Sequence, residues 1–209
     1  MTESLIAAFV TFLVVVDPFG VAPIFAGLTS EDTAAERRRL AVRGVAIGSG
    51  VLVAFAFGGQ ALLDALGITL PAFRIAGGLL LLLLSIDMVM ARQSGLRNTT
   101  PGEVEESSHR ADISVFPLAI PLIAGPGALT SVVLMMGRTQ GDIAMQASIL
   151  AVLVVVLAIT LICLLVAGQL MRLLGVTGMN VISRVSGMVV AALAVQFIVD
   201  GILAVIPTA

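Results

Sequence analysis

The sequence predicts an all-α integral membrane protein whose six transmembrane helices form two inverted three-helix repeats, with helices 1 and 4 broken. Its composition belongs in a bilayer: 59% of the 209 residues are hydrophobic, 11% are charged, and the mean hydropathy is +1.14. Soluble domains average about 45–50% apolar and about 25% charged residues. Two further observations support this fold class: six apolar stretches of spanning length, and motifs of the first half that recur in the second.

Each apolar stretch has about the 20 residues that a helix needs to cross a membrane. The stretches cover residues 4–27, 40–63, 70–90, 113–136, 145–167 and 181–206. Thr33 and Glu36 predict a capping box before the second stretch, and Pro71 lies in the first turn of the third, where proline is tolerated. We expect short turns at 137–142 and 168–179.

The chain is expected to form one membrane domain over residues 1–209. Residues 59–69 resemble residues 168–177, and the motif Arg74-Ile75-Ala76-Gly77 resembles Arg184-Val185-Ser186-Gly187. The predicted units are a first repeat at 1–90, a cytoplasmic connector at 91–112 and a second repeat at 113–209. Because each repeat has three spans, the second copy is inverted relative to the first, a plan that recurs in secondary transporters.

Helix breakers interrupt the first and fourth stretches. Asp17-Pro18-Phe19-Gly20 with Pro23 lies in the first, and Pro121 with Gly125-Pro126-Gly127 lies in the fourth. Broken backbone survives at membrane depth only where protein or a wet cavity satisfies its polar groups. The two breaks are therefore the predicted halves of a substrate-binding site, with candidate residues Asp17, Pro18, Gly20, Gly125, Gly127 and Thr130. The hydroxyl groups of Thr130 and Ser131 bond equally well to their own helix.

Charged residues inside the apolar stretches need partners, because an unpaired charge at the bilayer centre is costly. Arg74 and Arg184 are the candidate charge partners of Asp17, with snorkelling or capping as the alternative. Asp87 and Asp200 are either carboxylates at helix ends or members of a proton relay linked to Asp17.

Arginine alone predicts the orientation, because the chain has no lysine. Most arginines flank loops on one side: Arg37, Arg38, Arg39, Arg43, Arg92, Arg97, Arg110 and Arg172. Arg138 belongs to the loops of the other side. The positive-inside rule places the first group in the cytoplasm, so both termini are expected to be periplasmic or extracellular.

Several classes of function lack the residues they need. The single histidine, His109, lies in the connector and the single cysteine, Cys163, lies in an apolar run, so we expect no catalytic residues, no metal site and no cofactor. A net charge of −2 without a basic face argues against nucleic acid as a partner. The expected partners are a small-molecule substrate and the lipid bilayer. Small residues on the second stretch, including Gly44 and Gly48, serve packing within one copy or a homo-oligomer.

Three motifs together resemble the MarC family of bacterial inner-membrane proteins, a group close to the LysE-type exporters. They are Asp17-Pro18-Phe19-Gly20 with Pro23, Ala72-Phe73-Arg74-Ile75-Ala76-Gly77-Gly78, and residues 118–122 running into Ala124-Gly125-Pro126-Gly127. The resemblance covers about 5–206 and implies a multipass protein of the cell inner membrane with six spans. Some relatives are described as neutral amino-acid transporters. Where the family commonly carries asparagine, this chain has Val21, so one candidate polar ligand is missing.

These observations favour a secondary transporter of a small neutral amino acid or similar small metabolite, coupled to an ion or proton gradient. A non-transporting membrane scaffold or assembly protein is the alternative, and an intramembrane enzyme is disfavoured because the polar groups for catalysis are missing.

Overall fold

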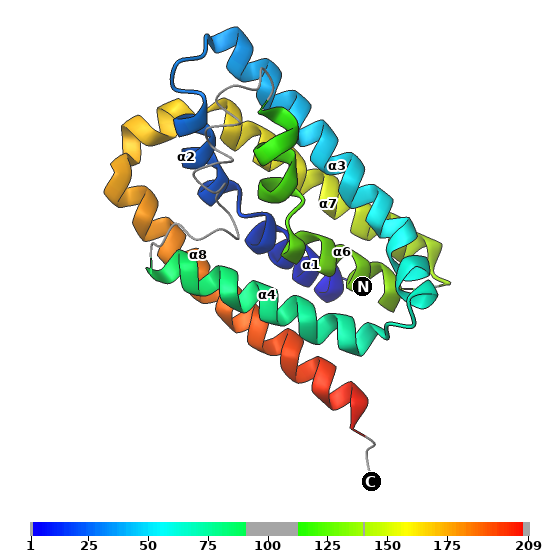
Figure 1. The fold of residues 1–209 in the computed structure, drawn as a ribbon. Helices are drawn as coiled ribbons and strands as arrows, with labels where there is room; N and C mark the ends of the chain where they lie inside the picture. Colours follow the sequence, from blue (N-terminus) through cyan, green and yellow to red (C-terminus); the bar gives the residue numbers. More distant parts are fainter. Residues whose placement is uncertain (1, 91–112, 140, 207–209) are drawn as a thin grey trace.

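Every regular element in the described part of the chain is a helix (Figure 1). The structure, a computed structural model, describes residues 2–90, 113–139 and 141–206, so the predicted connector and His109 lie outside the described residues. The elements are α1 (Thr2–Val16), α2 (Pro18–Leu28), α3 (Ala34–Ala65), α4 (Leu70–Met90), η1 (Ser114–Ile123), α6 (Pro126–Arg138), α7 (Ile143–Leu165) and α8 (Ala167–Val205). Within these residues five spans are long and apolar enough to cross a membrane, or six if η1 and α6 form one bent span.

Both predicted interruptions are present. Asp17 separates α1 from α2 in a left-handed conformation, with φ of 47° and ψ of 68°. η1 and α6 meet at an angle of 57° across Ala124 and Gly125. The backbone of η1 also leaves helical geometry at Phe116 and Ile120, each of which precedes a proline that disfavours the α region for its neighbour.

The starts of three helices follow from side-chain caps and a first-turn proline. The predicted capping box is confirmed, because the Glu36 amide donates to Thr33 Oγ1 and the Thr33 amide donates to Glu36 Oε2. Asp142 accepts from the Met145 amide at the start of α7. Pro71 lies in the first turn of α4 as predicted.

The turn predicted at 168–179 is wrong. α8 already begins at Ala167 and continues to Val205, with non-helical backbone at Gly175 alone, where φ is 63° and ψ is 179°. The more polar residues of this region form the first turns of α8. The apolar part of α8 follows and covers Thr177–Val205.

The helices of each half pack mainly on those of the other half. α3 lies against η1 and α6, whereas α7 lies against α1 and α2. α4 packs on α6, and α8 packs on α2. Gly44 and Gly48 of α3 are buried where Leu118 and Ile123 of η1 occupy the space beside them, so this pair of glycines serves packing within one copy.

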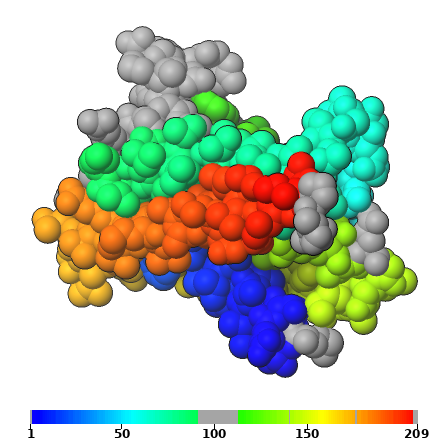
Figure 2. Space-filling model, turned by 90° about the horizontal axis from the view of Figure 1, so that it is seen from below, coloured from blue at the N-terminus to red at the C-terminus, as the bar shows by residue number. Residues whose placement is uncertain are grey.

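α4 and α8 form the most extensive contact of the molecule and run side by side along one face (Figure 2). A methyl group on Gly78 would lie 2.8 Å from the carbonyl oxygen of Ala194, and one on Gly201 would lie 2.9 Å from that of Pro71. Later residues of α4 therefore face earlier residues of α8, so the two helices are antiparallel. Small residues allow such close backbone approach in lipid.

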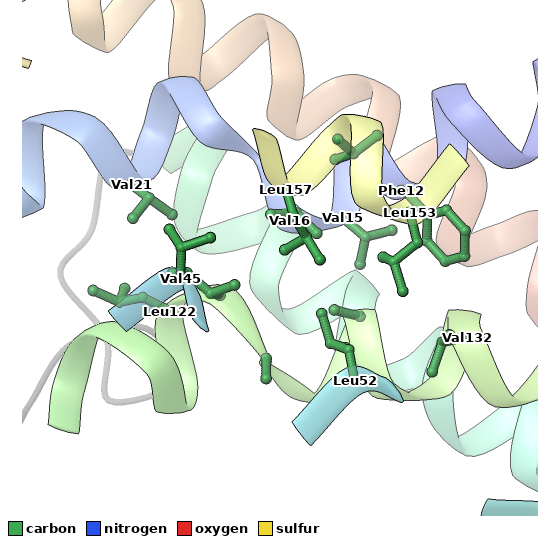
Figure 3. Close-up of a cluster of buried hydrophobic side chains, with 14 of the residues drawn as sticks. Phe12, Val15, Val16, Val21, Val45, Leu52, Leu122, Val132, Leu153 and Leu157 are labelled. Atoms are coloured by element: carbon green, nitrogen blue, oxygen red, sulfur yellow. The ribbon is translucent and has the colours of Figure 1, made fainter. Parts of the chain in front are cut away.

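The core joins the two broken spans to α3 and α7 (Figure 3). Phe12 and Val16 of α1 are fully buried, as are Val132 of α6 and Leu52 of α3, and Leu153 of α7 is 1% exposed. The two interruptions therefore lie next to this core, with Asp17 and Ala124 buried and Phe19 and Pro126 exposed.

Candidate functional site

A small cleft lies where the second break meets α1 and α4. Its empty volume is about 380 Å³, including the space at its open side. It is lined by Val15, Leu80, Leu84, Pro121, Leu122, Gly125, Pro126, Gly127 and Ala128. All these side chains are apolar, so the polar groups that the described residues offer to the cleft belong to the main chain.

The second break presents the uncapped start of α6 to this cleft. No side chain in the described part of the chain caps α6, and Pro126 at its first position has no amide hydrogen. The first amide that bonds back to the break is that of Leu129, which donates to the Gly125 carbonyl oxygen at 3.0 Å. The amides of Gly127 and Ala128 precede it, at the end of the helix that carries a partial positive charge. The break therefore offers donors suited to an anionic group.

The first break is organised by Asp17. Its side chain is 3% exposed and accepts a hydrogen bond from the Gly20 amide at 3.1 Å, so the carboxylate caps α2. The left-handed backbone at Asp17 is tolerated more readily by aspartate than by most residues. Pro18 is buried beside it. Asp17 does not line the cleft, although Val15, two residues earlier in the last turn of α1, does.

Gly127 brings the two breaks into contact. The side chains of Val15 and Leu81 fill the space beside its Cα atom, and a methyl group on Gly127 would lie 2.8 Å from Val15 Cγ1. The end of α1 and the start of α6 thus meet at one cleft. Of the predicted substrate-binding residues, Gly125 and Gly127 line the cleft, whereas Asp17, Pro18, Gly20 and Thr130 do not.

The two hydroxyl groups after the second break differ. Thr130 Oγ1 donates to the carbonyl oxygen of Pro126, four residues earlier in the same helix, at 2.8 Å. Ser131 is fully buried, and its hydroxyl has no hydrogen-bond partner among the described residues. Buried polar groups are usually paired, so Ser131 requires an explanation.

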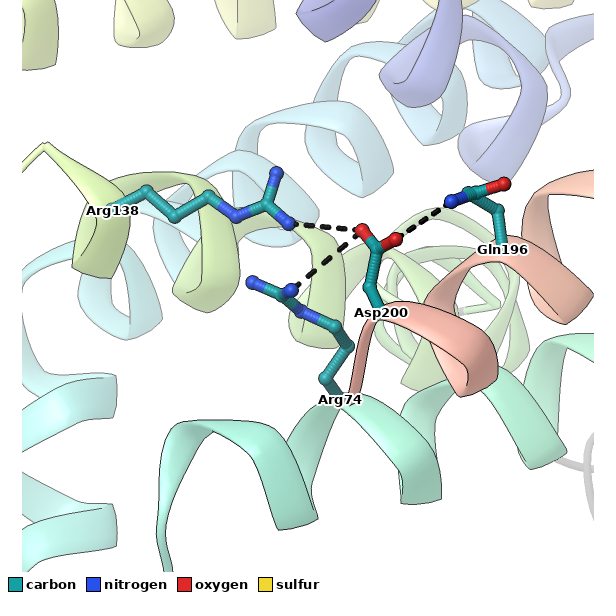
Figure 4. Close-up of polar contacts among 4 residues, drawn as sticks. All are labelled: Arg74, Arg138, Gln196 and Asp200. Atoms are coloured by element: carbon teal, nitrogen blue, oxygen red, sulfur yellow. Dashed lines mark hydrogen bonds and ion pairs between the residues drawn. The ribbon is translucent and has the colours of Figure 1, made fainter. Parts of the chain in front are cut away.

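The predicted charge partners lie elsewhere. Arg74 Nη1 lies 3.7 Å from Asp200 Oδ2, and Arg138 Nη2 lies 3.2 Å from the same oxygen (Figure 4). Arg184 is exposed and belongs to none of the ion pairs found between described residues. Asp87 is half-buried in α4. The structure therefore brings Arg74 to Asp200 rather than to Asp17.

The sequence prediction missed the apolar walls of the cleft. Leu80 and Leu84 belong to a run of six leucines at 79–84, in which nothing distinguishes one helix face from another. Val15 and Leu122 carried a usable signal, because each lies within a few residues of a predicted break.

Comparison with known proteins agrees with these features. The family described as MarC family integral membrane protein matches residues 2–206. UPF0056 membrane protein MJ1677 of Methanocaldococcus jannaschii is 36% identical over 200 residues, covering 96% of each chain. UPF0056 membrane protein YhcE of Escherichia coli is 34% identical, covering 95% of this chain and 92% of the relative.

The UPF0056 inner membrane protein MarC of Escherichia coli is 31% identical, covering 95% of this chain and 94% of the relative. No solved structure matches the chain significantly. The matched residues include both breaks, the cleft and the arginines described above. This chain therefore belongs to the MarC family of integral membrane proteins.

Proposed function

We propose that this protein is a secondary transporter of a small neutral amino acid or similar small metabolite, coupled to an ion or proton gradient across the inner membrane. One observation carries the proposal: the end of α1 and the uncapped start of α6, each beside a helix break, line the same cleft. Broken helices that meet near the midplane bind substrate in many secondary transporters. A protein that only packs against partners gains nothing from two such breaks.

The packing of the helices supports an inverted repeat. Exchanging α1 and α2 for η1 and α6, α3 for α7, and α4 for α8 turns most cross-half contacts into another observed contact or into themselves, whereas the small contact of α1 with α8 has no such counterpart among the described residues. The contact of α3 with η1 and α6 becomes that of α7 with α1 and α2, and α4 on α6 becomes α8 on α2. The antiparallel course of α4 and α8 agrees with the same exchange.

The chemistry of the cleft favours a zwitterion with an apolar side chain. Amides of Gly127 and Ala128 at the start of α6 suit a carboxylate. The last carbonyl groups of α1 lack intrahelical amide partners and suit an ammonium group or a coupling ion. Apolar side chains such as Leu84 and Leu122 form the remaining walls and suit an apolar side chain of the cargo.

The arginine distribution supports an orientation with both termini outside. Arg37, Arg38, Arg39 and Arg43 gather at the start of α3, whereas Arg138 ends α6 at the opposite end of the bundle (Figure 1). The positive-inside rule assigns the start of α3 to the cytoplasm. The C-terminal end of α8 then reaches the other side, as does the start of α1.

Counterflow of labelled small neutral amino acids into proteoliposomes, with and without a pH or sodium gradient, tests the proposal. Leu84→Phe fills the cleft with a larger side chain and should reduce uptake by about tenfold or more, because the cargo loses its space. Leu83→Phe is the matched control. Leu83 is adjacent to Leu84 in the sequence, but it is 50% exposed and does not line the cleft, so uptake should stay near the wild-type value.

Equal uptake by the two variants would remove the cleft as the binding site. If no small amino acid or related metabolite exchanges in the wild-type protein, and none raises its melting temperature in detergent, the scaffold hypothesis is favoured instead. A ligand that binds only the native state raises apparent stability, so the second measurement does not depend on turnover.

A further inference from the structure

A cluster of polar side chains joins three helices at the end of the molecule where α4 begins and α6 and α8 end. We call Arg74, Arg138, Gln196 and Asp200 the Asp200 cluster (Figure 4). The two arginines reach Asp200 Oδ2, and Gln196 Nε2 donates to Asp200 Oδ1 at 2.6 Å. Asp200 thus accepts hydrogen bonds from α6 and α8 and forms an ion pair with Arg74 of α4.

The charges within the Asp200 cluster do not balance. Two guanidinium groups share a single carboxylate oxygen, so the cluster carries a net positive charge of one. The Arg74 side chain is only 14% exposed, and its Nε atom has no hydrogen-bond partner among the described residues. A guanidinium group can bind a carboxylate with two parallel hydrogen bonds, and this arrangement leaves part of that capacity unused.

We propose that Arg74 and Arg138 form a carboxylate-binding site, which Asp200 itself occupies in this conformation. The chemical class of the ligand is a small molecule with a free carboxylate. That this carboxylate belongs to the transported cargo rests on the proposed function, whereas the binding site itself does not. Asp200 acts as an internal competitor, because the ligand and Asp200 need the same guanidinium donors.

The position of the Asp200 cluster connects it to the cleft. Arg74 precedes the cleft residue Leu80 by six residues of α4, about 9 Å along a helix. Arg138 follows Gly127 by eleven residues of α6, about 16 Å. Both α4 and α6 therefore run from the Asp200 cluster to the cleft.

Ligand binding at this site also changes what holds α8. α8 packs chiefly on α4 and α2, and the bond from Arg138 to Asp200 links it to the end of α6. A carboxylate that takes Arg138 from Asp200 removes this link. The arrival of a ligand is thereby coupled to the release of α8 from α6.

Acetate, titrated against the full-length protein in detergent, is a suitable probe. Binding is measured as the rise in melting temperature, with sodium chloride at equal ionic strength as the salt control because exposed ion pairs are screened. Asp200→Asn removes the internal competitor with little change of shape and should lower the dissociation constant for acetate by about tenfold, as expected for a regained charge-assisted bond. Adding Arg138→Gln to that variant should abolish the gain.

Two matched variants complete the experiment. Arg184→Gln removes the exposed arginine that aligns with Arg74 and should leave acetate binding unchanged. Leu84→Phe alters the proposed cargo site, so acetate binding that persists in Leu84→Phe while counterflow is lost separates this proposal from the proposed function. If folded Asp200→Asn binds acetate no more tightly than the wild-type protein, or if Arg184→Gln weakens binding as much as Arg138→Gln, the assignment is overturned.

If Asp200→Asn does not fold, Arg138→Gln in the wild-type background decides. The Arg138 side chain is 56% exposed, so its replacement should leave the fold intact. Acetate binding weakened by about tenfold supports the site, and unchanged binding overturns it.

Discussion

Gly67 and Gly175 both have positive φ angles, 68° and 63°, and they are partners in the alignment of residues 59–69 with residues 168–177. Gly67 follows the end of α3, and Gly175 interrupts α8 ahead of its apolar part. Among the described residues, no atom lies within 4 Å of a methyl group built on either glycine. The two positions therefore share a backbone requirement rather than a packing requirement.

Replacing either glycine with alanine should lower the stability of the protein. At a positive φ an alanine costs about 1 kcal/mol, because its Cβ approaches the following carbonyl oxygen. We expect Gly67→Ala and Gly175→Ala each to lower the melting temperature in detergent. Gly50→Ala is the control: Gly50 lies inside α3 with open space beside it, so alanine should raise the melting temperature. A rise for Gly67→Ala like that of the control would contradict the strain argument.

Substitutions of Asp17 can separate its cap on α2 from the proposed role of its charge in transport. The asparagine introduced by Asp17→Asn still tolerates the left-handed conformation and can still accept the bond from the Gly20 amide, so the melting temperature should change little. Asp17→Ala loses both the cap and the tolerated conformation and should cost about 1–2 kcal/mol. If the negative charge serves transport, counterflow falls in both variants. Wild-type counterflow in stable Asp17→Asn would show that transport does not need the negative charge of Asp17.

Gly59 of α3 and Val133 of α6 form a close packing contact between the two helices. A methyl group on Gly59 would collide with Val133 Cγ2, yet it would lie 3.4 Å from Val133 Cβ, an ordinary contact distance. Gly59→Ala should therefore cost about 1–3 kcal/mol by overpacking. In Gly59→Ala/Val133→Ala the collision is gone, and the double variant should be more stable than the sum of the two single changes.

The adjacent Gly58 provides the control for this cycle. A methyl group there meets nothing within 4 Å, so Gly58→Ala should not destabilise the protein. The coupling between Gly59 and Val133 is obtained from the melting temperatures, in one detergent, of the wild-type protein, the two single variants and the double variant. Strict additivity between Gly59→Ala and Val133→Ala would mean that α3 and α6 are not packed as described.

Ser131 tests whether an unpaired hydroxyl has a function. It is fully buried without a partner among the described residues, so Ser131→Ala should raise stability by about 1 kcal/mol by removing an unsatisfied group. Ser85 is the matched control, since it is 1% exposed and its hydroxyl donates to the Leu82 carbonyl oxygen at 2.7 Å. Ser85→Ala should give no such gain. A Ser131→Ala variant that is more stable but slower in counterflow would assign the hydroxyl to the cargo.

Local signals in the sequence were sufficient for the ends and interruptions of most helices. Thr33 with Glu36 predicts the start of α3 because the capping box needs only neighbouring residues, and Pro71 predicts the first turn of α4 for the same reason. The breaks at Asp17 and Gly125 follow from proline and glycine in apolar runs. The region 168–179 was misjudged because its glycines and polar residues are typical of a turn, although only Gly175 leaves helical geometry.

Contacts between helices could not be predicted in the same way. The pairing of Arg74 with Asp200 joins residues from opposite halves of the chain, and no periodicity along one sequence specifies it. Leu84 could not be assigned to the cleft, since an all-leucine run has no polar face to orient it. Part of the candidate site, the glycines of the second break, could be predicted from the sequence because glycine and proline interrupt helices. The apolar walls depend on how the helices are placed around it.

The glycine contacts between α4 and α8 constrain how the bundle can move. The Ile198 side chain of α8 packs against Gly78 of α4, and the Ile75 side chain of α4 packs against Gly201 of α8. Each helix therefore has a glycine groove that is filled by an isoleucine of the other helix. If one helix moved along its axis relative to the other, these isoleucines would lose their packing against the glycines. In any transport cycle that opens the interior to one side of the bilayer and then to the other, α4 and α8 must therefore move together as a rigid body.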